Sequence, residues 1–513
     1  MNIKQWWRKQ STPYVIAGFI SLVLSAWISL QAGVINPDAI CYLLSAQTIG
    51  TSGLPAAMKL CGQAQWPFYS VLIYTIAHTT HLSFAVSAYF LNSIFTLLSV
   101  IFFMLIVERL GANRNTIWLA AAVILLAHHF LDVRQYIIRD HGFWAAYLAA
   151  VYCLLVFYKH PTKRYALYFN ISLLMATLFR IEGLVFLILA PFITWFIRDH
   201  TFKSRLRLFL MLITPIACIG LIAVIALWLK SQSEIVHISR LQYLYQQINQ
   251  LHDFAISRYT AGKDMLTRYV LPLEAAADAG SIWLTVLMMS YLLNIFTNLT
   301  PVYAFLVLYA WIYQLPKQEN PTMRNNNVVI YGFILINILI TATFFAEYFF
   351  LSQRYLIALT LMLMTWVPFA LNHLLSHWQE KRSRIIYICA SILIIVYALT
   401  AIINFRDSKV YIYQAGNWLN QHVPNDKTIY SNDMQVMYYS NHFGNTIFQH
   451  LTDKFSWAEL NNQQWKQADY VALRVNEHDA ADAKPILDQI HTQPLATFSN
   501  KRGDKVYIYT LHS

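Results

Sequence analysis

Charged side chains are scarce in this chain. Asp, Glu, Lys and Arg make up 12% of its 513 residues, and 57% are hydrophobic. A soluble globular domain carries about 25% charged residues, so the composition excludes an ordinary soluble protein and predicts that lipid surrounds most of the chain. The formal net charge of +12 does not indicate nucleic-acid binding, because the basic residues form short clusters between apolar runs and not one groove-like patch.

The N-terminus lacks a convincing small-residue cleavage site, and the chain lacks repeats of fixed period and low-complexity tracts. The basic stretch KQWWRK near the N-terminus is followed by an apolar run longer than the core of a signal peptide. We therefore expect a retained signal anchor whose N-terminus lies in the cytoplasm.

Apolar runs of membrane-spanning length recur along the chain. A helix needs about twenty apolar residues to cross a hydrocarbon core about 30 Å thick. About eleven runs qualify: 13–33, 86–107, 117–131, 143–158, 165–180, 183–197, 208–229, 299–314, 328–346, 355–375 and 385–403. One side of this scheme carries the basic clusters KQWWRK, ERLGANR, KHPTKR, RDHTFKSRLR, LPKQENPTMR and EKRSR. It is denser in Lys and Arg than the opposite loops, so we predict that it is cytoplasmic.

Two further apolar stretches are predicted not to cross. A crossing at 281–296 would place the later basic clusters outside, and 66–78 has no basic flank that supports a crossing. Both are expected to lie along the outer interface or to be re-entrant. An odd number of crossings then places the C-terminus on the outer side.

The composition changes at about residue 404. Beyond it the pattern predicts an amphipathic helix, a Pro-Asn-Asp turn, a short β-rich run and another helix, and ADYVALRV and DKVYIYTL are typical of strands. The expected fold is a polytopic α-helical membrane domain at 1–403, with interfacial helices in outer loops 34–85 and 230–298. A small extracytoplasmic α/β domain follows at 404–513.

Cysteines are few as well. Cys153, Cys218 and Cys389 fall within predicted spans, where cysteine usually packs as a small apolar residue. Cys41 and Cys61 share the first outer loop, in a compartment that permits a disulfide. The sequence is equally compatible with a bridge and with two unpaired thiols.

The middles of the predicted spans are almost free of charge. The ionisable residues gather at their outer ends: Asp38, Lys59, Asp132, Arg134, Arg139, Asp140, Arg180, Glu182, Glu347 and Arg354. Charges at one depth are typical of a polar site at the interface, whereas a transporter places them near the bilayer midplane. Single interfacial arginines can also snorkel to headgroups, and Arg180 with Glu182 can form an ion pair that closes a turn. Asp38 has no basic neighbour in its own segment.

Histidines are concentrated in one stretch. HHFLDVRQYIIRDHG, residues 128–142, contains His128, His129 and His141 beside two acids. No HxxxH or HxH spacing occurs in it, so a divalent metal site is possible but not favoured.

Several motifs together resemble those of GT-C membrane glycosyltransferases. Within that fold they are most similar to the bacterial relatives of protein O-mannosyltransferases and of lipid A aminoarabinose transferases. They are NPDAICYLLSAQTIGTSGLP, WPFYSVLIY, VERLGA, RDHGFWAAYLAAVYCLLVFY, FRIEGLVFLILAPF, SQRYLIALTLMLM and AGNWLNQHVPNDKTIYSND. The chain departs from the family in having Asp38–Ala39 where many relatives have Asp-Glu, and Trp66–Pro67 where they have Pro-Pro. These departures leave the donor and acceptor class open.

The resemblance implies sugar transfer from a polyprenyl-phosphate donor to lipid A, an envelope glycan or a protein, at the outer face of a bacterial inner membrane. It implies an inverting displacement in which Asp38 is the general base. It also implies roles for other residues: Arg354, Tyr355, Arg139, Lys59 and Arg180 would bind the donor phosphate, and Asp140, His141 and Glu182 would position the sugar or acceptor. No cofactor is expected to be required. Two other functions remain open: a lipid-linked sugar flippase or transporter, and an envelope scaffold that binds through 404–513.

Overall fold

The computed structural model describes residues 11–198, 201–231, 256–316, 321–403, 409–443, 447, 457, 464–490 and 492–511. The chain forms two compact units. The first unit consists of Met1–Leu24, Ser93–Val133 and Arg139–Ile402, and the second of Ser25–Asn92, Arg134–Ile138 and Ile403–Ser513. The basic cluster KQWWRK and residues 232–255 of the predicted outer loop 230–298 lie outside the described residues.

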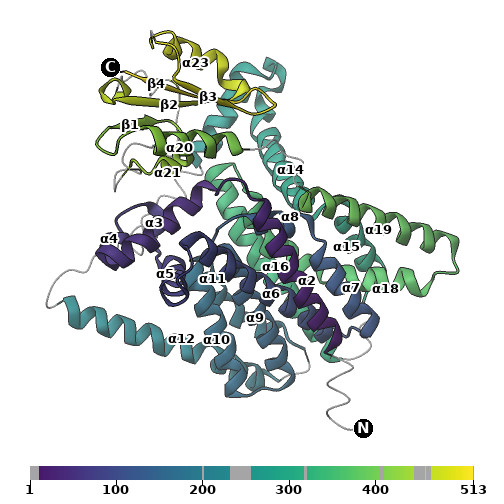
Figure 1. The fold of residues 1–513 in the computed structure, drawn as a ribbon. Helices are drawn as coiled ribbons and strands as arrows, with labels where there is room; N and C mark the ends of the chain where they lie inside the picture. The colour runs from purple at the N-terminus through teal and green to yellow at the C-terminus, as the bar shows by residue number, and fades with distance from the viewer. Residues whose placement is uncertain are drawn as a thin grey trace. The chain divides into compact units, whose positions relative to one another are not determined.

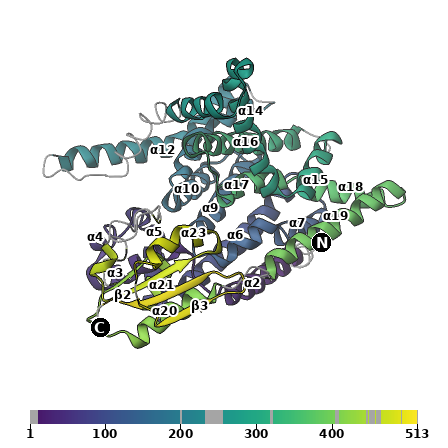
Figure 2. The same cartoon turned by 90° about the horizontal axis from the view of Figure 1, so that it is seen from above.

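The first unit is helical (Figures 1 and 2). Its described helices are α7 (Arg114–Leu125), α8 (His128–Asp132), η2 (Val133–Gln135), α9 (Asp140–Lys159), α10 (Lys163–Phe179), α11 (Glu182–Leu189), η3 (Ala190–Phe196), α12 (Phe202–Ser231), η4 (Leu273–Asp278), α14 (Ala279–Leu299), α15 (Pro301–Ile312), α16 (Pro321–Tyr348), α17 (Gln353–Met364), α18 (Val367–Ser376) and α19 (Lys381–Ile402). Three helices, α2 (Thr12–Gln31), α6 (Phe84–Arg109) and η2, contribute residues to both units.

The chain is a multi-pass membrane protein. Within the described residues, seven helices are long and apolar enough to cross a membrane, or eight if the bent pair α7–α8 counts as one span. Apolar side chains are exposed along α2, α14 and α19, for example Phe19, Leu284 and Ile392. Lipid solvates such side chains, whereas α9 and α17 are buried inside the bundle.

Several predicted spans are short or broken in the structure. The run at 117–131 bends by 57° between α7 and α8. The run at 183–197 changes from α11 to the 3-10 helix η3 near Pro191, and 299–314 supplies only the 12 residues of α15. Eleven regular spans are therefore not present in the described residues, because proline and helix breaks shorten segments that hydropathy alone counts as whole.

The two stretches predicted not to cross differ from each other. The run at 66–78 forms α5 (Phe68–Thr80), whose 13 residues are too few to span the hydrocarbon core. The run at 281–296 forms most of α14, and Leu273–Leu299 has the length and hydropathy of a membrane span.

The second unit contains a mixed four-stranded sheet. Its helices are α3 (Pro37–Ser52), α4 (Leu54–Ala57), η1 (Gly62–Gln65), α5, α20 (Val410–His422), α21 (Met434–Ser440), η5 (Gln464–Gln467), η6 (Glu477–Asp479) and α23 (Ala480–Leu487), and its strands are β1 (Ile429–Ser431), β2 (Tyr470–Val475), β3 (Ala496–Ser499) and β4 (Lys505–Thr510). The strand order is β1-β2-β4-β3. The β1–β2 pair is parallel, with Ile429 opposite Tyr470, and the other two pairs are antiparallel.

Helices cover both faces of this sheet (Figure 1). Val471 and Leu473 pack with Ile486 of α23. Because side chains alternate along a strand, Ala472 points to the opposite face, where α20 packs against β3 and β4. Asp469, directly before β2, connects the starts of β1 and β2. It accepts hydrogen bonds from the backbone N–H of Thr428 at 2.9 Å and from the Lys427 ammonium at 3.1 Å. These donors lower the pKa of Asp469 to about 2.

The first loop of the chain packs within the same unit as this sheet. The backbone N–H of Ile35 donates to the Tyr439 hydroxyl at 3.0 Å, and the Gln435 amide donates to the Ile35 carbonyl. Both partners belong to α21. The segment that leads into α3 is therefore held by the C-terminal part of the chain.

Candidate active site

A buried ion cluster lies where α9, α10 and α11 meet. Arg180, the C-cap residue of α10, pairs with Asp140 at the start of α9 and with Glu182 at the start of α11. The side chains of Arg180 and Asp140 are 12% and 4% exposed. Ionised groups are buried only when they are paired, so this cluster has a defined geometry. The sequence predicted the Arg180–Glu182 pair as one alternative, and Asp140 is the partner it did not reveal.

Two glycines allow the helices to approach closely at this cluster. A Cβ atom at Gly142 of α9 would lie 2.4 Å from the Phe179 ring of α10, and one at Gly183 would lie 2.4 Å from the backbone nitrogen of Thr177. Any larger residue would push these helices apart. The glycine of the RIEG motif therefore permits the sharp turn that sets Glu182 beside Arg180.

Tyr355 stands between two arginines. The guanidinium carbon of Arg180 lies 4.6 Å from the centre of the Tyr355 ring, and that of Arg354 lies 5.2 Å from it. A cation within about 6 Å of an aromatic centre is attracted to the ring face. The Arg-Tyr pair at the start of α17 thus joins the ion cluster of α9, α10 and α11.

A hydrogen-bond network holds the start of α17. The amide of Asn298, the penultimate residue of α14, donates to the Gln353 carbonyl at 2.8 Å and to its side-chain oxygen at 2.9 Å. The Thr360 hydroxyl in turn donates to the side-chain oxygen Oδ1 of Asn298 at 3.0 Å. Asn298 and Thr360 are buried, and Gln353 directly precedes Arg354. The network therefore fixes the helix end that presents the Arg354–Tyr355 pair.

These groups line a cavity of about 260 Å³. Its charged and polar lining includes Arg180, Glu182, Glu347, Arg354 and Tyr355, and its apolar walls include Phe143, Trp144, Phe186, Phe344 and Ala358. Guanidinium groups suit the oxygens of phosphate, because they offer bidentate donors in a planar fork. A lining with aromatic walls and two guanidinium groups suits an amphiphile with an anionic head.

Two further predicted site residues belong to the same unit. Arg139, the N-cap residue of α9, lies close enough to act electrostatically on Asp140 and Glu182. His141 is 1% exposed, and its ring nitrogens contact the Thr96 hydroxyl at 3.1 Å and the Val133 carbonyl at 3.2 Å. His141 therefore takes part in helix packing and is not among the residues that line the cavity.

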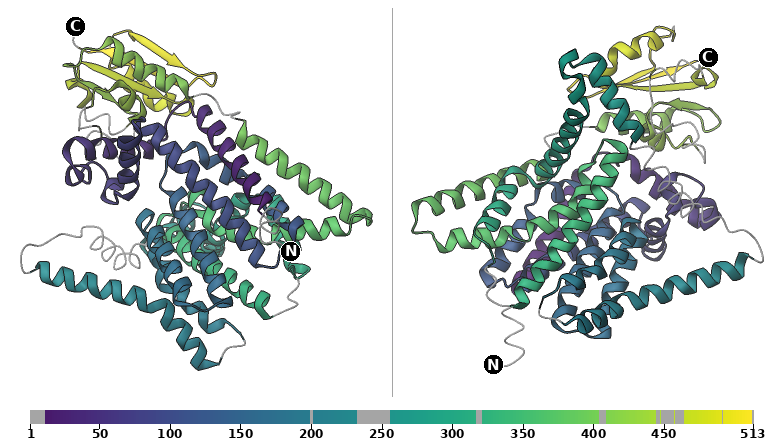
Figure 3. Two further views of the ribbon diagram at one scale, coloured as in Figure 1. Left: turned by 60° about the horizontal axis from the view of Figure 1, so that its bottom comes forward. Right: turned by 180° about the vertical axis from the view of Figure 1, so that it is seen from behind.

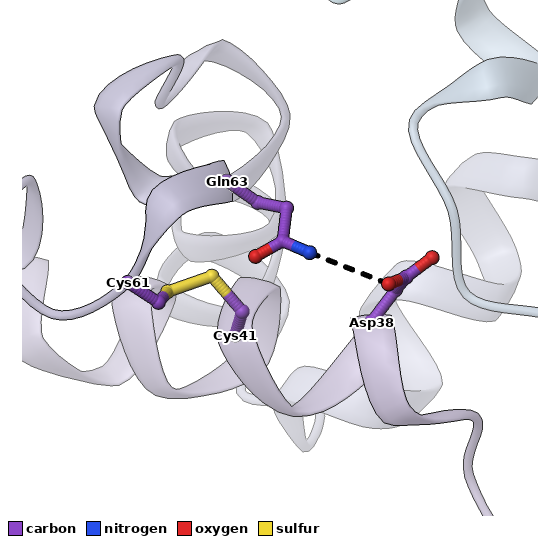
Figure 4. Close-up of a disulfide and its surroundings, with 4 residues drawn as sticks. All are labelled: Asp38, Cys41, Cys61 and Gln63. Carbon is purple, nitrogen blue, oxygen red and sulfur yellow. Dashed lines mark hydrogen bonds between the residues drawn. A yellow bond between two sulfur atoms is a disulfide. The ribbon is translucent and has the colours of Figure 1, made fainter. Parts of the chain in front are cut away.

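Asp38 and Lys59 lie in the second unit. Asp38 is in the first turn of α3 and accepts a hydrogen bond from the Gln63 amide at 3.3 Å (Figure 4). Cys41, one turn further along α3, forms a disulfide with Cys61, which precedes the short helix that carries Gln63. Lys59 is exposed after α4. The disulfide thus connects the helix of Asp38 to the segment that supplies its hydrogen-bond donor.

The residue two positions before Asp38 anchors the same turn. The side-chain oxygen of Asn36 accepts from the Ile137 backbone N–H at 2.8 Å, and its amide donates to the Ile137 carbonyl at 3.3 Å. Asn36 is thus paired with both backbone groups of one residue. Ile137 is three residues before Asp140 in the chain.

The histidines of the 128–142 stretch point to separate partners. His128 contacts the Tyr397 carbonyl at 2.8 Å, and His129 contacts the Thr297 carbonyl at 3.2 Å. Across the part of the chain that the structure describes, no three His, Cys, Asp or Glu residues are grouped so that they could hold a metal ion.

Sequence reasoning missed three polar contributors. Asn337 lines the cavity and donates to the Tyr147 hydroxyl at 2.7 Å, and Asn298 holds the start of α17. An asparagine inside the apolar run ILINILITA was the available signal for Asn337. Glu347 was recognised as an interfacial charge, although it was not assigned to the site.

Solved structures show which fold this arrangement belongs to. The oligosaccharyltransferase of Archaeoglobus fulgidus, solved with Zn and sulfate, matches 96% of this chain and 73% of its own length, with 14% identity and a TM-score of 0.57. ArnT from Cupriavidus metallidurans, bound to undecaprenyl phosphate, matches 98% of this chain and 99% of its own, with 13% identity and a TM-score of 0.52.

A third structure is AglB from A. fulgidus in complex with an inhibitory peptide and a dolichol-phosphate. It matches 97% of this chain and 75% of its own, with 11% identity and a TM-score of 0.53. No protein-family model and no curated protein matches the chain in sequence. Over nearly its full length, the chain therefore has the fold of the GT-C membrane glycosyltransferases.

Proposed function

We propose that the protein is an inverting glycosyltransferase that moves a sugar from a polyprenyl-phosphate donor to lipid A, an envelope glycan or a protein. The observation that carries the proposal is the cavity of the first unit, in which Arg354, Tyr355 and Arg180 meet between apolar walls. The similar structures of ArnT and AglB hold undecaprenyl phosphate and a dolichol-phosphate. A lipid phosphate of this class has the anionic head and apolar tail that such a lining suits.

The two arginines have different roles in this proposal. Arg180 is paired with two carboxylates, so its charge is already balanced and it orders the site. Arg354 binds the donor phosphate and stabilises the negative charge that develops on it as the sugar leaves. Arg139 adds positive potential beside Asp140. Glu182, on the cavity wall, accepts hydrogen bonds from sugar hydroxyls.

Asp38 is the proposed general base. The acceptor hydroxyl attacks the anomeric carbon while its proton passes to the Asp38 carboxylate. The bond from that carbon to the donor phosphate oxygen breaks, and polyprenyl phosphate leaves with the bonding electron pair. A single displacement of this kind inverts the anomeric configuration. The Asp38 side chain is half-buried and turned toward Gln63 (Figure 4), whose amide donates a hydrogen bond that orients the carboxylate.

The orientation belongs to the proposal as well. We place the N-terminus in the cytoplasm, residues 404–513 in the periplasm, and the Arg180 cluster at the outer face of a bacterial inner membrane. In this arrangement residues 1–403 carry out the transfer. The proposed reaction requires no cofactor, because arginines supply the positive charge that the leaving phosphate needs.

The decisive experiment compares cells with and without the gene by mass spectrometry of envelope lipids, glycans and proteins. Loss of one sugar from an acceptor, together with accumulation of the polyprenyl-phosphate sugar, is the expected result. Purified protein in liposomes should then release free polyprenyl phosphate only when an acceptor extract is added. Movement of the intact donor between leaflets without release of lipid phosphate would instead identify a flippase and overturn the proposal.

A further inference from the structure

A second, larger groove lies in the first unit between α10 and α12. Its volume is about 680 Å³, and it is lined by Lys163, Leu167, Lys203, Leu206, Arg207, Leu210, Met211, Thr214 and Pro215. The two helices are joined beside it by the Asn170 amide, which donates to the Leu212 carbonyl at 3.1 Å in a buried hydrogen bond. The two helices that bound the groove therefore pack on each other. The second of them, α12, is the long teal helix of Figure 3.

The groove is at the end of α10 remote from the ion cluster. Lys163 is the first residue of α10, and Arg180 is the C-cap residue at its other end. A helix rises about 1.5 Å per residue, so the 17 residues of α10 separate the two ends by roughly 25 Å, close to the thickness of a hydrocarbon core. The groove and the Arg180 cluster are therefore at opposite ends of α10.

Three cations stand at the mouth of the groove. Lys163, Lys203 and Arg207 are all exposed, and none of the described residues that line the groove is acidic. Lys203 and Arg207 are four residues apart on α12, so they share one helix face. Three positive charges without an acid partner attract an anion, and Arg207 can bind two phosphate oxygens at once.

The floor of the groove is apolar. Leu206, Leu210 and Met211 continue the stripe of Lys203 and Arg207 toward the middle of α12, and Leu167 faces them from α10. Leu167 and Leu210 are each 48% exposed. Basic residues therefore stand at one end of the groove, and a narrow apolar strip leads away from them along the helices.

We propose that this groove binds an anionic glycerophospholipid, independently of the proposed transfer reaction. The phosphate lies among Lys163, Lys203 and Arg207, and one acyl chain lies along Leu206 and Leu210. An anionic headgroup is favoured over a zwitterionic one, because the cations have no acid to satisfy the ammonium group of the latter. The charge pattern selects a bilayer phospholipid, and the distance from Arg354 separates this site from the donor site.

The test is native mass spectrometry of the purified full-length protein in detergent. The protein is titrated with dioleoyl phosphatidylglycerol and, separately, with dioleoyl phosphatidylethanolamine. We expect the anionic lipid to bind at least tenfold more tightly. The double substitution Lys203→Gln/Arg207→Gln should weaken its binding by roughly 30-fold, since each basic side chain near a lipid surface contributes about one factor of five. Binding of the zwitterionic lipid, whose headgroup has no net charge, should weaken less than fivefold.

The matched control is Lys381→Gln/Arg382→Gln, which removes the same charge from exposed positions at the start of α19. It should change the affinity less than twofold. A second variant, Leu206→Ala/Leu210→Ala, should weaken the binding of both lipids by about tenfold through lost apolar contact. It tests the same groove if the charge variant does not fold. Equal binding of the two lipids, an equal loss in the control, or displacement of the lipid by the same concentration of inorganic phosphate would each overturn the proposal.

Discussion

The guanidinium of Arg180 lies against the ring of Tyr355, with 4.6 Å between its central carbon and the ring centre. These residues belong to the end of α10 and the start of α17, and Arg354 approaches the same ring at 5.2 Å. Two cations so close repel each other unless other charges offset them. Asp140 and Glu182 balance Arg180, and Arg354 is the residue proposed to bind the donor phosphate.

Arg354→Ala should raise the donor concentration needed for half-maximal transfer. A hydrogen bond to a charged group contributes about 1.5–3 kcal/mol, so the loss in kcat/KM is about 10- to 100-fold. The measurement is release of polyprenyl phosphate at varied donor concentration. Arg382→Ala is the control, because Arg382 is exposed at the start of α19. An unchanged donor requirement in Arg354→Ala would remove this residue from the phosphate site.

Asp38→Asn should lower kcat by about 10²- to 10⁴-fold, the usual contribution of a positioned general base. Asn keeps the shape and the hydrogen-bond acceptor for Gln63, so the variant should fold and retain its Cys41–Cys61 bridge. Gln63→Leu is the companion variant: it removes the 3.3 Å hydrogen bond but keeps the carboxylate, and we expect a loss of less than tenfold. Near-normal turnover by folded Asp38→Asn would show that another group takes the proton.

Arg180→Met should destabilise the protein by about 3–5 kcal/mol, because it leaves the buried Asp140 and the half-buried Glu182 without their cation. Thermal unfolding of the purified variants in one detergent measures the effect. The triple variant Arg180→Met/Asp140→Asn/Glu182→Gln should recover much of the lost stability, since no unpaired charge remains. If the triple variant is no more stable than the single one, pairing of these charges is not what Arg180 contributes.

Asn298→Leu should raise the donor KM by about tenfold with little change in kcat. The substitution removes the hydrogen bonds that hold Gln353, directly before Arg354, and one such bond contributes about 1.4 kcal/mol. Asn294→Leu is the control: it is the same substitution in the same helix, and the amide of Asn294 donates to the local Ser290 carbonyl at 2.8 Å. An equal rise in KM for both variants would contradict a specific role for Asn298.

The Cys41–Cys61 bridge should be found in protein purified without reductant. Non-reducing peptide mass spectrometry should detect the linked pair, and Cys41→Ser/Cys61→Ser should lower the free energy of unfolding by about 3 kcal/mol, as expected for a loop of 20 residues. Cys153→Ser/Cys389→Ser is the control, because both of these thiols are free. Full alkylation of Cys41 and Cys61 before reduction would show that neither is bridged.

Part of the fold follows from local pattern. The apolar residues of ADYVALRV and DKVYIYTL follow the pattern typical of strands, and these segments form β2 and β4. The sequence did not predict the short strand β3. Its four residues lie at an edge of the sheet, and four residues are too few for a clear alternation of apolar and polar side chains. The number of regular spans also escaped prediction. Hydropathy sums over a window, whereas Pro191 and the bend between α7 and α8 depend on local backbone geometry.

Composition and the spacing of apolar runs, taken alone, determined that this is a multi-pass membrane protein with a small C-terminal α/β domain. They also identified Arg180, Glu182 and Arg354 as charges that lipid would not tolerate without partners. Only the tertiary structure decided which partners these are. Asp140 reaches Arg180 because Gly142 lets α9 approach Phe179, and Arg354 is placed by Asn298 from a distant helix. Such contacts depend on how helices far apart in the chain pack, which local residue patterns do not encode.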